Sequence, residues 1–416
     1  MAKAIGPNAS ALLQGAPRRK TAHPEFSQNK IFFYVSGVEM ERCYLLIDGA
    51  NAASTLFVPD SDICNIPGGK LTPEGIAQIR SHLLIDEVLP FNALEQKLEA
   101  IHTLYVLHQP DEQAFTTKGG IVQSSRFRAA DPWEQHRRRD EMLVLNLKKR
   151  FPRIELADLG PVTSKMRLIK SPAEIAVLRG AGELSAHVCI ECMKATQPGI
   201  PLQTLEAISD YVYRLKGNCG HGYEIMLEPS HERADTLLDG DLVLLDCGPD
   251  YNYYTSDIAR IWPINGHFDS WQRHTYGLIT AYHKVLLSLA APGCRHDEVY
   301  EEAAKRMLAL YKDDPEGTAI VKNMIARNVR YYNHHVGLSV HDVVSATRED
   351  PLEEGMVLVV DPMVWLEDAP HGYVRVEDTI VITANGCERL TGSAPFEIEA
   401  IEALMKEPGR FPLELS

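Results

Sequence analysis

Several features that define common protein classes are missing from this sequence of 416 residues. No run of about 18 apolar residues occurs, so we expect no transmembrane helix. The first ten residues contain one lysine and no apolar segment, which argues against a secretory signal peptide. The eight cysteines are scattered along a long chain, so we expect no disulfide framework. These absences together predict a cytoplasmic protein that does not bind membranes.

Net positive charge is also lacking. Lys and Arg number 42 against 57 Asp and Glu, which gives a formal net charge of −15. A protein that binds nucleic acid normally presents a basic surface to the phosphates. We therefore expect no nucleic-acid partner. Hydrophobic residues make up 45% of the chain, which is typical of a globular protein, and the length favours more than one domain.

The spacing of apolar residues predicts two differently organised parts. In the first part strands and helices alternate, with strands expected at 31–35, 44–48, 55–58 and 104–107 and helices at 72–84, 92–101 and 134–151. In the second part we expect helices at 171–196, 202–215, 270–290 and 296–311 and strands at 241–247, 258–262, 356–360 and 373–383. We place the boundary at residue 160, and the order of elements in the second part favours an α+β domain.

Two motifs could carry chemistry but have simpler explanations. Cys189 and Cys192 form a Cys-x-x-Cys pair inside a predicted helix, and no second pair follows at the spacing of a zinc site. Small buried residues are therefore favoured over a redox or metal role. The Arg137-Arg138-Arg139 run could bind an acidic partner, but pairing with Asp140 and Glu141 on a solvated helix face is favoured.

Five residues in ordered contexts form the main candidate site. Asp246 ends an apolar strand, and Asp257 follows 11 residues later. Asp361 ends a second apolar run. His334 opens the histidine-rich stretch 334–341, and Glu377 lies in the stretch 374–382. A carboxylate at the inner end of an apolar strand is costly unless it is paired or bound to a metal. Oxygen ligands with one imidazole suit Mn, Fe, Co or Zn. On these residues alone, a metal site and unrelated strand-end carboxylates are about equally supported.

Longer stretches around these residues have a recognisable pattern. They are Arg167–Ile175, Gly240–Gly248, Tyr254–Arg260, His334–His341, Gly355–Pro362 and Val374–Asp378. In these stretches the sequence resembles the pita-bread metallopeptidases, the family of aminopeptidase P, prolidase and methionine aminopeptidase. Residues 25–37 and 54–59 also resemble the creatinase/prolidase-type N-terminal domain. That domain favours the aminopeptidase P and prolidase branch.

The resemblance implies a fold and a metal centre. The fold is an α+β chain in which a smaller α/β N-terminal domain, residues 1–160, precedes a pita-bread catalytic domain, residues 161–416. The centre holds two divalent ions, with Mn²⁺ as the first choice and Co²⁺, Zn²⁺ or Fe²⁺ as alternatives. Asp257 and Glu377 would bridge both ions, Asp246 would chelate one, and His334 would bind the other.

The resemblance also implies an activity. Peptides with proline at the second position would be hydrolysed at the N-terminal Xaa-Pro bond by a metal-activated bridging water, in an aminopeptidase or a dipeptidase. Asp361, a ligand at the family's glutamate position, would take the proton of the water. His341 would contact the substrate beside the scissile carbonyl, and Arg375 would support Glu377. Relatives with this N-terminal domain are often homodimers, so we expect one here.

The sequence departs from the family pattern at several positions. Asp361 is about 1.5 Å shorter than the usual glutamate. Arg330 stands where the family has a histidine, which suggests an altered substrate, such as one with a carboxylate. His231 could replace a family histidine in the loop before Asp246, although a surface residue is about equally supported. His335 and His371 are expected to be local hydrogen-bonding residues rather than ligands.

Two other functions remain open. The departures at Asp361 and Arg330 fit a non-peptidase enzyme on this fold, such as a lyase or C–N hydrolase that acts on a small charged substrate. A non-catalytic binding module is also possible, but such modules commonly lose metal ligands, and all five positions here retain them. Metal content distinguishes the last case, because a binding module should purify without stoichiometric metal.

Overall fold

The computed structural model describes residues 1–17, 26–59, 73–111, 118–133, 137–215, 220–229, 235–328, 334–343, 350–366 and 373–410. Contacts divide the chain into two compact units, Met1–Met166 (unit 1) and Arg167–Ser416 (unit 2). The expected boundary after residue 160 lies at the start of helix α7 (Gly160–Leu168), and the structural division falls inside this helix. None of the helices in the described ranges combines the length and the apolar character that a membrane span requires.

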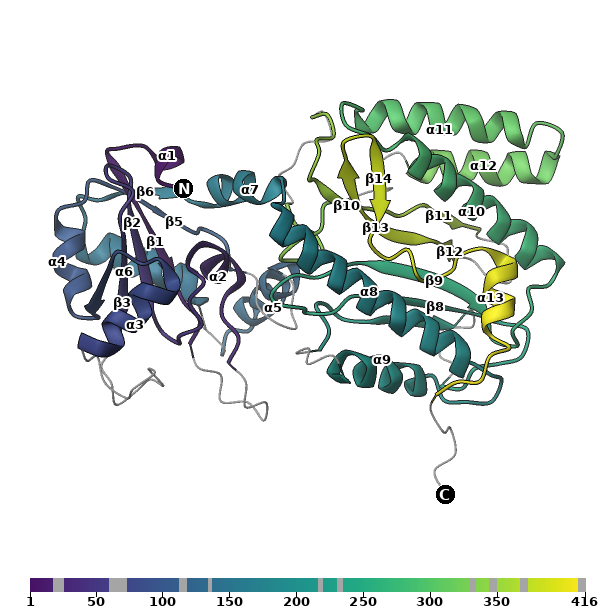
Figure 1. The fold of residues 1–416 in the computed structure, drawn as a ribbon, viewed down its shortest axis with the longest axis horizontal. Helices are drawn as coiled ribbons and strands as arrows, with labels where there is room; N and C mark the ends of the chain where they lie inside the picture. Colours follow the sequence, from purple (N-terminus) through teal and green to yellow (C-terminus); the bar gives the residue numbers. More distant parts are fainter. Residues whose placement is uncertain are drawn as a thin grey trace, which may run out of the picture. The chain divides into compact units, whose positions relative to one another are not determined.

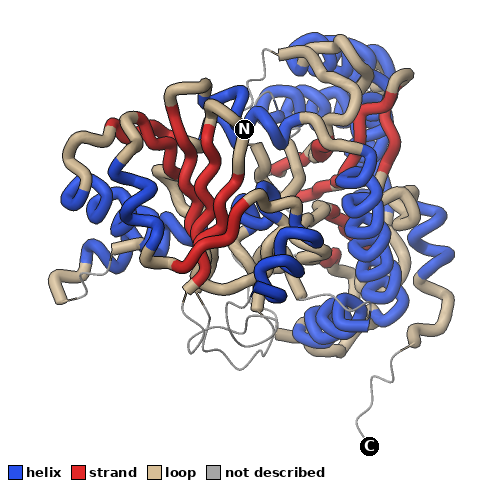
Figure 2. Tube along the Cα trace, turned by 60° about the vertical axis from the view of Figure 1, so that its left-hand side comes forward, coloured by secondary structure: helices blue, strands red, loops and turns tan. Residues whose placement is uncertain are grey.

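Unit 1 is built on a six-stranded mixed sheet with the strand order β4-β3-β2-β1-β5-β6. The strands are β1 (Ala9–Gln14), β2 (Tyr44–Asp48), β3 (Ser54–Val58), β4 (Glu87–Pro90), β5 (Thr103–Val106) and β6 (Glu155–Asp158). The helices before α7 are α1 (Ala2–Ile5), α2 (Lys30–Ser36), α3 (Pro73–Leu83), α4 (Ala93–Glu99), α5 (Lys118–Ala130) and α6 (Arg139–Arg150). Helices cover both faces of this sheet (Figure 2).

Alternation along β1 explains the two faces. Ala11 and Leu13 pack in one apolar cluster with Phe32 of α2, whereas Leu12 packs in a second cluster with Leu147 of α6. Successive side chains of a strand point to opposite faces, so a continuous apolar run such as β1 can fill two cores at once.

The prediction of a strand over residues 31–35 is wrong, because the segment forms helix α2. The carboxylate of Asp111 accepts hydrogen bonds from the backbone N–H groups of Ile31 and Phe32, at 2.8 and 3.1 Å. A negative charge at a helix N-terminus satisfies free donors and complements the helix dipole. Gly37 ends the helix in the left-handed conformation, with φ of 66°. The β propensity of residues 31–35 is therefore overridden by a capping residue that lies far away in the sequence.

The arginine run precedes and begins α6 rather than forming a free basic patch. Arg138 pairs with Asp140 at 2.9 Å and with Glu141 at 2.9 Å, and Arg139 donates to the carbonyl of Gly15. The helix predicted over 134–151 therefore begins at Arg139, later than expected; residues 134–136 lie outside the described ranges.

Unit 2 contains an antiparallel sheet with the strand order β10-β13-β9-β8-β7, and β14 pairs with β13 (Figure 1). The strands are β7 (Met226–Pro229), β8 (Leu242–Cys247), β9 (Ile258–Pro263), β10 (Val357–Val360), β13 (Glu377–Thr383) and β14 (Gly386–Arg389), with a separate pair β11 (Met363–Trp365) and β12 (Tyr373–Arg375). The helices are α8 (Pro172–Ala195), α9 (Gln203–Leu215), α10 (Ser270–Leu289), α11 (His296–Leu310), α12 (Pro315–Asn328) and α13 (Ile398–Leu404). The strand predicted over 373–383 is thus two strands, β12 and β13, interrupted at Val376.

Helix α8 begins where the sequence predicts and packs against the sheet. Ser171 accepts a hydrogen bond from the N–H of Glu174, and the Glu174 side chain accepts from the N–H of Ser171, so the expected capping box is confirmed. Cys189 and Cys192 are fully buried on this helix, and the Cys192 thiol donates to the carbonyl of Leu205 in α9. Burial raises the pKa of Cys192 well above its usual value, so the thiol is unreactive, as expected for a packing residue.

Replacement of Asp111 by alanine should destabilise unit 1, because the first N–H groups of α2 lose their acceptor inside the protein. We expect the free energy of unfolding to fall by about 1–2 kcal/mol. Urea unfolding followed by circular dichroism measures this change. The exposed Glu99→Gln change is the control and should shift the free energy by less than about 0.5 kcal/mol. Equal stability of the two variants would contradict the capping role.

Candidate metal centre

Strand register brings three carboxylates to one face of the sheet in unit 2. Asp246 on β8 pairs with Ala259 on β9, and Glu377 on β13 pairs with the same Ala259 from the other side. Directly paired residues present their side chains on the same face. Asp257 lies two positions before Ala259, so it shares that face. The small methyl group of Ala259 leaves space between the carboxylates.

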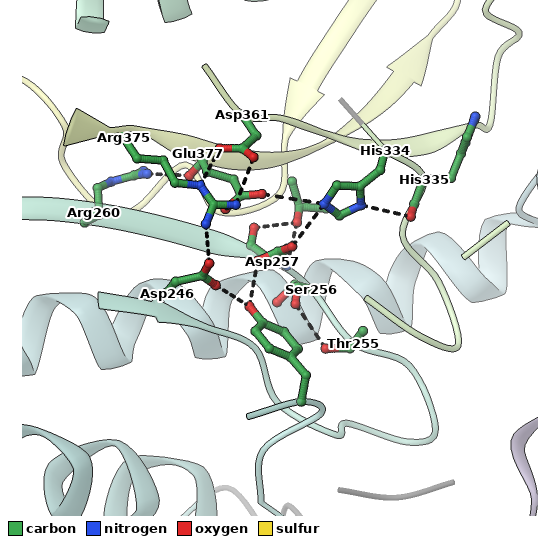
Figure 3. Close-up of polar contacts among 12 residues, drawn as sticks. Asp246, Thr255, Ser256, Asp257, Arg260, His334, His335, Asp361, Arg375 and Glu377 are labelled. Carbon is green, nitrogen blue, oxygen red and sulfur yellow. Dashed lines mark hydrogen bonds and ion pairs between the residues drawn. The ribbon is translucent and has the colours of Figure 1, made fainter. Parts of the chain in front are cut away.

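Two further residues arrive from the other side of β13. Val360 on β10 pairs with Asp378, so continuation of the register by one residue places Asp361 opposite Glu377. The segment that begins at His334 runs beside β10, where the N–H of Val359 donates to the His334 carbonyl at 2.8 Å. Figure 3 shows the imidazole and the carboxylates pointing toward one another. The structure therefore brings together all five residues that the sequence singles out.

Asp257, His334 and Glu377 form a group that fits a metal ion. One donor atom from each lies within 4.8 Å of the others. The Nε2 atom of His334 is 3.4 Å from the Asp257 carboxylate and 3.8 Å from Glu377 Oε1. Both carboxylates are buried, and among the described residues the Glu377 carboxylate is contacted by the charged groups of Arg375 and His334. Buried carboxylates with one imidazole suit a divalent cation.

Arg375 links the remaining carboxylates. Its guanidinium group makes two parallel contacts to Asp361, Nε to Oδ1 at 2.5 Å and Nη2 to Oδ2 at 2.9 Å. The same group contacts Asp246 Oδ2 at 2.5 Å and Glu377 Oε2 at 2.7 Å. A planar fork of five N–H donors suits this arrangement. Arg375 therefore contacts more than Glu377, the residue that the sequence predicts it to support.

Burial and the neighbouring charges together shift the pKa values of the clustered carboxylates. Burial raises the pKa of Asp246 to about 7, against the opposing charge of Arg375. Burial also raises the pKa of Asp361, and it raises that of Glu377 well above the usual range. Burial acts in the same direction on Asp257, but the hydrogen bond and charge of His334 outweigh it, so the pKa of Asp257 is lowered. Cations beside these carboxylates favour their charged forms.

The His341 ring packs edge-on against His334, with the ring centroids 4.3 Å apart. Desolvation of the ring by the surrounding protein atoms lowers the pKa of His341 to about 4, and the charge of His334 acts in the same direction. The imidazole is therefore neutral near pH 7, and it carries one N–H donor and one acceptor nitrogen. Because the residue remains accessible to solvent, it can meet a ligand at the edge of the metal centre.

Asp342 holds the loop that carries both histidines. Its carboxylate accepts two hydrogen bonds from Arg167, at 3.1 and 2.9 Å, and one from the N–H of Leu338 at 3.0 Å. Its own N–H donates to the carbonyl of His335. Arg167, the first residue of the family motif Arg167–Ile175, thus pairs with the loop that carries His334 and His341.

Tyr223 is a site residue that the sequence reasoning missed. Its hydroxyl lies 2.9 Å from Asp246 Oδ1 and 2.6 Å from Asp257 Oδ1. Burial and the two carboxylates raise its pKa well above the usual value, so the hydroxyl stays protonated as a donor. A buried tyrosine needs a polar partner, but no motif around this residue identifies which one.

The remaining candidates divide into two groups. His231, Arg330 and His371 lie outside the described residues. His335 points away from the carboxylates (Figure 3). Its Nδ1 atom has no hydrogen-bond partner within the described ranges, so the expected local hydrogen bond of that ring nitrogen is not found. The His335 carbonyl instead accepts a contact from His334 Nδ1 at 3.3 Å.

The chain belongs to metallopeptidase family M24, whose model matches residues 176–384. A second model, described as the aminopeptidase P N-terminal domain, matches residues 1–105. These matches confirm the resemblance and the expected architecture of a pita-bread domain after a smaller N-terminal domain.

Individual relatives agree with this family. The chain is 31% identical to the Xaa-Pro aminopeptidase of Escherichia coli K12, over 96% of this chain and 94% of that protein. It is similar to the structure of proline aminopeptidase P II from Yersinia pestis, with a TM-score of 0.76, 28% identity and coverage of 97% and 96% of the two chains. It is also similar to zinc-substituted E. coli aminopeptidase P in complex with product, with a TM-score of 0.73, 28% identity and coverage of 97% and 95%.

Replacement of Asp342 by alanine should destabilise unit 2 strongly, because Arg167 would remain buried without its partner. The side chains of this pair are 10% and 4% exposed, and removal of one member of such a pair costs about 3–5 kcal/mol. Urea unfolding measures the change. The matched control is Glu388→Ala, which breaks the half-exposed pair with Arg179 and should cost about 0–1 kcal/mol. Similar losses in both variants would contradict this role.

Proposed function

We propose that this protein is a metal-dependent Xaa-Pro aminopeptidase or dipeptidase. The observation that carries the proposal is the convergence of Asp257, His334 and Glu377 on one face of the sheet, within 4.8 Å. The named activities of the E. coli and Y. pestis relatives support it, since the similarity extends over nearly the whole chain.

The proposed centre holds two divalent ions, and Mn²⁺ is the first metal to test. Asp257, His334 and Glu377 would hold one ion. Asp246 and Asp361 are the nearby carboxylates that would contribute to holding the second ion. Four carboxylates crowded into a buried site favour bound positive charge. Co²⁺, Zn²⁺ and Fe²⁺ suit the same donors, and a zinc-substituted relative supports this range.

The residues of the chain divide the work of peptide hydrolysis. Divalent ions in such a centre supply an activated water and polarise a carbonyl. Asp361 has a raised pKa and is the proposed proton acceptor. His341, neutral near pH 7, donates its N–H to the carbonyl oxygen of the scissile bond. Arg375 holds the carboxylates in place, and Tyr223 fixes the relative position of Asp246 and Asp257.

The proposed substrate is inferred from the sequence. Peptides with proline at the second position are the proposed substrates, and Arg330 and His231 are proposed to contact them. An arginine at position 330 favours a substrate that offers a carboxylate. The Asp361–Arg375 pair and Arg330 also favour a second candidate, a non-peptidase enzyme that acts on a small charged molecule.

We also propose a cytoplasmic location and a homodimeric state. The scattered cysteines support a reducing compartment. The resemblance supports the dimer, because family members with this type of N-terminal domain are often homodimers. Light scattering of the purified protein tests the dimer, and a mass of one chain would exclude it under those conditions.

The central experiment strips the protein of metal and adds back Mn²⁺, Co²⁺ or Zn²⁺. We expect release of the N-terminal residue from Xaa-Pro dipeptides or Xaa-Pro-Xaa tripeptides to return with metal. Asp257→Ala should abolish both metal retention and cleavage, because it removes a ligand. Asp313→Ala is the control, since that carboxylate is 91% exposed. Bound metal without cleavage of either peptide would favour the non-peptidase candidate, and absence of metal would exclude the metal-dependent proposal.

The role of His341 gives a separate prediction. Removal of a donor that stabilises a developing oxyanion costs about 10²–10³ in kcat. We therefore expect His341→Ala to lower kcat by that factor with metal content unchanged, because His341 is not among the three clustered ligands. Steady-state kinetics and elemental analysis of the same preparation test this. Loss of metal from the variant would show that His341 acts as a ligand instead.

A further inference from the structure

We infer that Trp365 and Tyr373, on the strand pair β11–β12, form an aromatic face beside the metal centre that selects the N-terminal residue of the substrate. This face favours peptides whose first residue is itself aromatic. The inference rests on the peptidase proposal above and goes beyond it, because it names the class of N-terminal residue that is preferred.

The strand pair β11–β12 has one buried face and one open face (Figure 1). Val364 pairs with Val374, and both side chains belong to the apolar core of unit 2, at 0% and 1% exposure. Trp365 pairs with Tyr373, so this pair lies on the opposite face. The side chain of Trp365 is 44% exposed. A large aromatic side chain that solvent can reach offers a ligand apolar surface.

The open face continues into the metal centre. Arg375 comes two positions after Tyr373 on β12, so the two side chains point to the same side of the strand. The guanidinium group of Arg375 contacts Asp361 and Glu377. Burial raises the pKa of Tyr373, and the charges of Arg375 and Asp361 also act on it, in agreement with this placement. The aromatic face therefore extends from the carboxylates toward solvent.

The two rings of the aromatic face contact each other. Their centroids are 4.3 Å apart, and their planes are inclined by 42°. The strand register, in which Trp365 lies opposite Tyr373, holds the two rings together. A ligand can therefore pack against a surface that is already in place, which lowers the entropic cost of binding. A flat aromatic side chain gains most from such a surface, because aromatic rings attract one another beyond the effect of buried area.

The charges of the centre indicate which part of a peptide lies over the aromatic face. Figure 3 shows His334 and Arg375 on opposite sides of the carboxylates. His341 packs against His334 and is proposed to meet the scissile carbonyl on that side. The free amino group of a peptide is a cation, and the carboxylates of Asp246 and Asp361 outnumber the one guanidinium group on the other side. The N-terminal residue therefore lies on the side from which the aromatic face extends.

The test compares cleavage of Phe-Pro-Ala with Ala-Pro-Ala, or of Phe-Pro with Ala-Pro, by the metal-loaded protein. We expect kcat/KM of the wild-type protein to be about tenfold higher for the phenylalanine peptide, and Trp365→Ala to lower this ratio to about one. The difference should lie in KM rather than kcat, because the aromatic face is away from the bond that is cleaved. Both peptides are assayed with one preparation, so loss of folded protein cancels from the ratio.

Two further variants serve as controls. Trp365→Phe keeps an aromatic ring and should retain the ratio within about threefold of the wild-type value. Trp133→Ala removes a tryptophan of unit 1 that is 94% exposed and should leave the kinetics of both peptides unchanged. Equal ratios in the wild-type protein and Trp365→Ala would overturn the inference. A preference for Ala-Pro-Phe over Phe-Pro-Ala that Trp365→Ala abolishes would also overturn it, because the aromatic face would then bind the other end of the peptide. The peptidase proposal stands in both cases.

Absence of any cleavage would instead contradict the peptidase proposal, and binding then tests the aromatic face. Isothermal titration of the Mn²⁺-loaded protein with Phe-Pro and Ala-Pro replaces the kinetic assay. Tighter binding of Phe-Pro that is lost in Trp365→Ala would support the inference. Equal affinities, or binding of neither dipeptide, would overturn it.

Discussion

Burial of four carboxylates in one small region is the constraint on which the rest of unit 2 depends. Asp246, Asp257, Asp361 and Glu377 are each less than 7% exposed, and isolated carboxylates at such positions would be very costly. The hydroxyl of Tyr223, the imidazole of His334 and the guanidinium group of Arg375 contact these carboxylates and reduce this cost. One guanidinium and one imidazole are fewer cations than the four carboxylates, so the region is a candidate site for further positive charge.

The opposite face of β13 keeps this arrangement rigid. Asp378 follows Glu377 and points to the other side of the sheet, where Arg260 binds its carboxylate at 2.8 Å. Arg260 also donates to the backbone carbonyl of Glu377 at 2.6 Å. Arg260 and Asp378 are both fully buried. Thr391 adds a further hydrogen bond to Asp378. The candidate metal ligand Glu377 is thus held through its backbone carbonyl by Arg260, which forms an ion pair with Asp378 on the face away from the site.

Much of the fold and of the candidate site follows from local sequence. The 11-residue spacing of Asp246 and Asp257 indicates a strand, turn and return strand, and the β8–β9 register bears this out. The Ser171–Glu174 capping box is equally local. The roles assigned to individual site residues remain predictions, although the structure brings the five ligand candidates together.

The features that sequence reasoning missed depend on distant partners. Helix α2 forms because Asp111 supplies its cap from 80 positions away. Tyr223 becomes a site residue because the sheet brings it to two aspartates, and Asp342 gains its role from Arg167, 175 positions away. Propensity and periodicity describe neighbours along the chain and cannot report these contacts. The same limit applies to Arg375. Its position near Glu377 in the sequence does not indicate that its guanidinium group contacts both carboxylate oxygens of Asp361.

The placement of β13 has a consequence for the order in which the site is made. This strand lies between β9 and β10, and it supplies Glu377, the last ligand candidate in the chain. A ribosome releases residues in sequence order. Strands β8 and β9 therefore emerge well before β13, the strand that lies between β9 and β10 in the sheet. During that interval Asp246 and Asp257 lie on an incomplete sheet. A nascent chain therefore cannot bring the five candidate ligands together until residue 377 has left the ribosome.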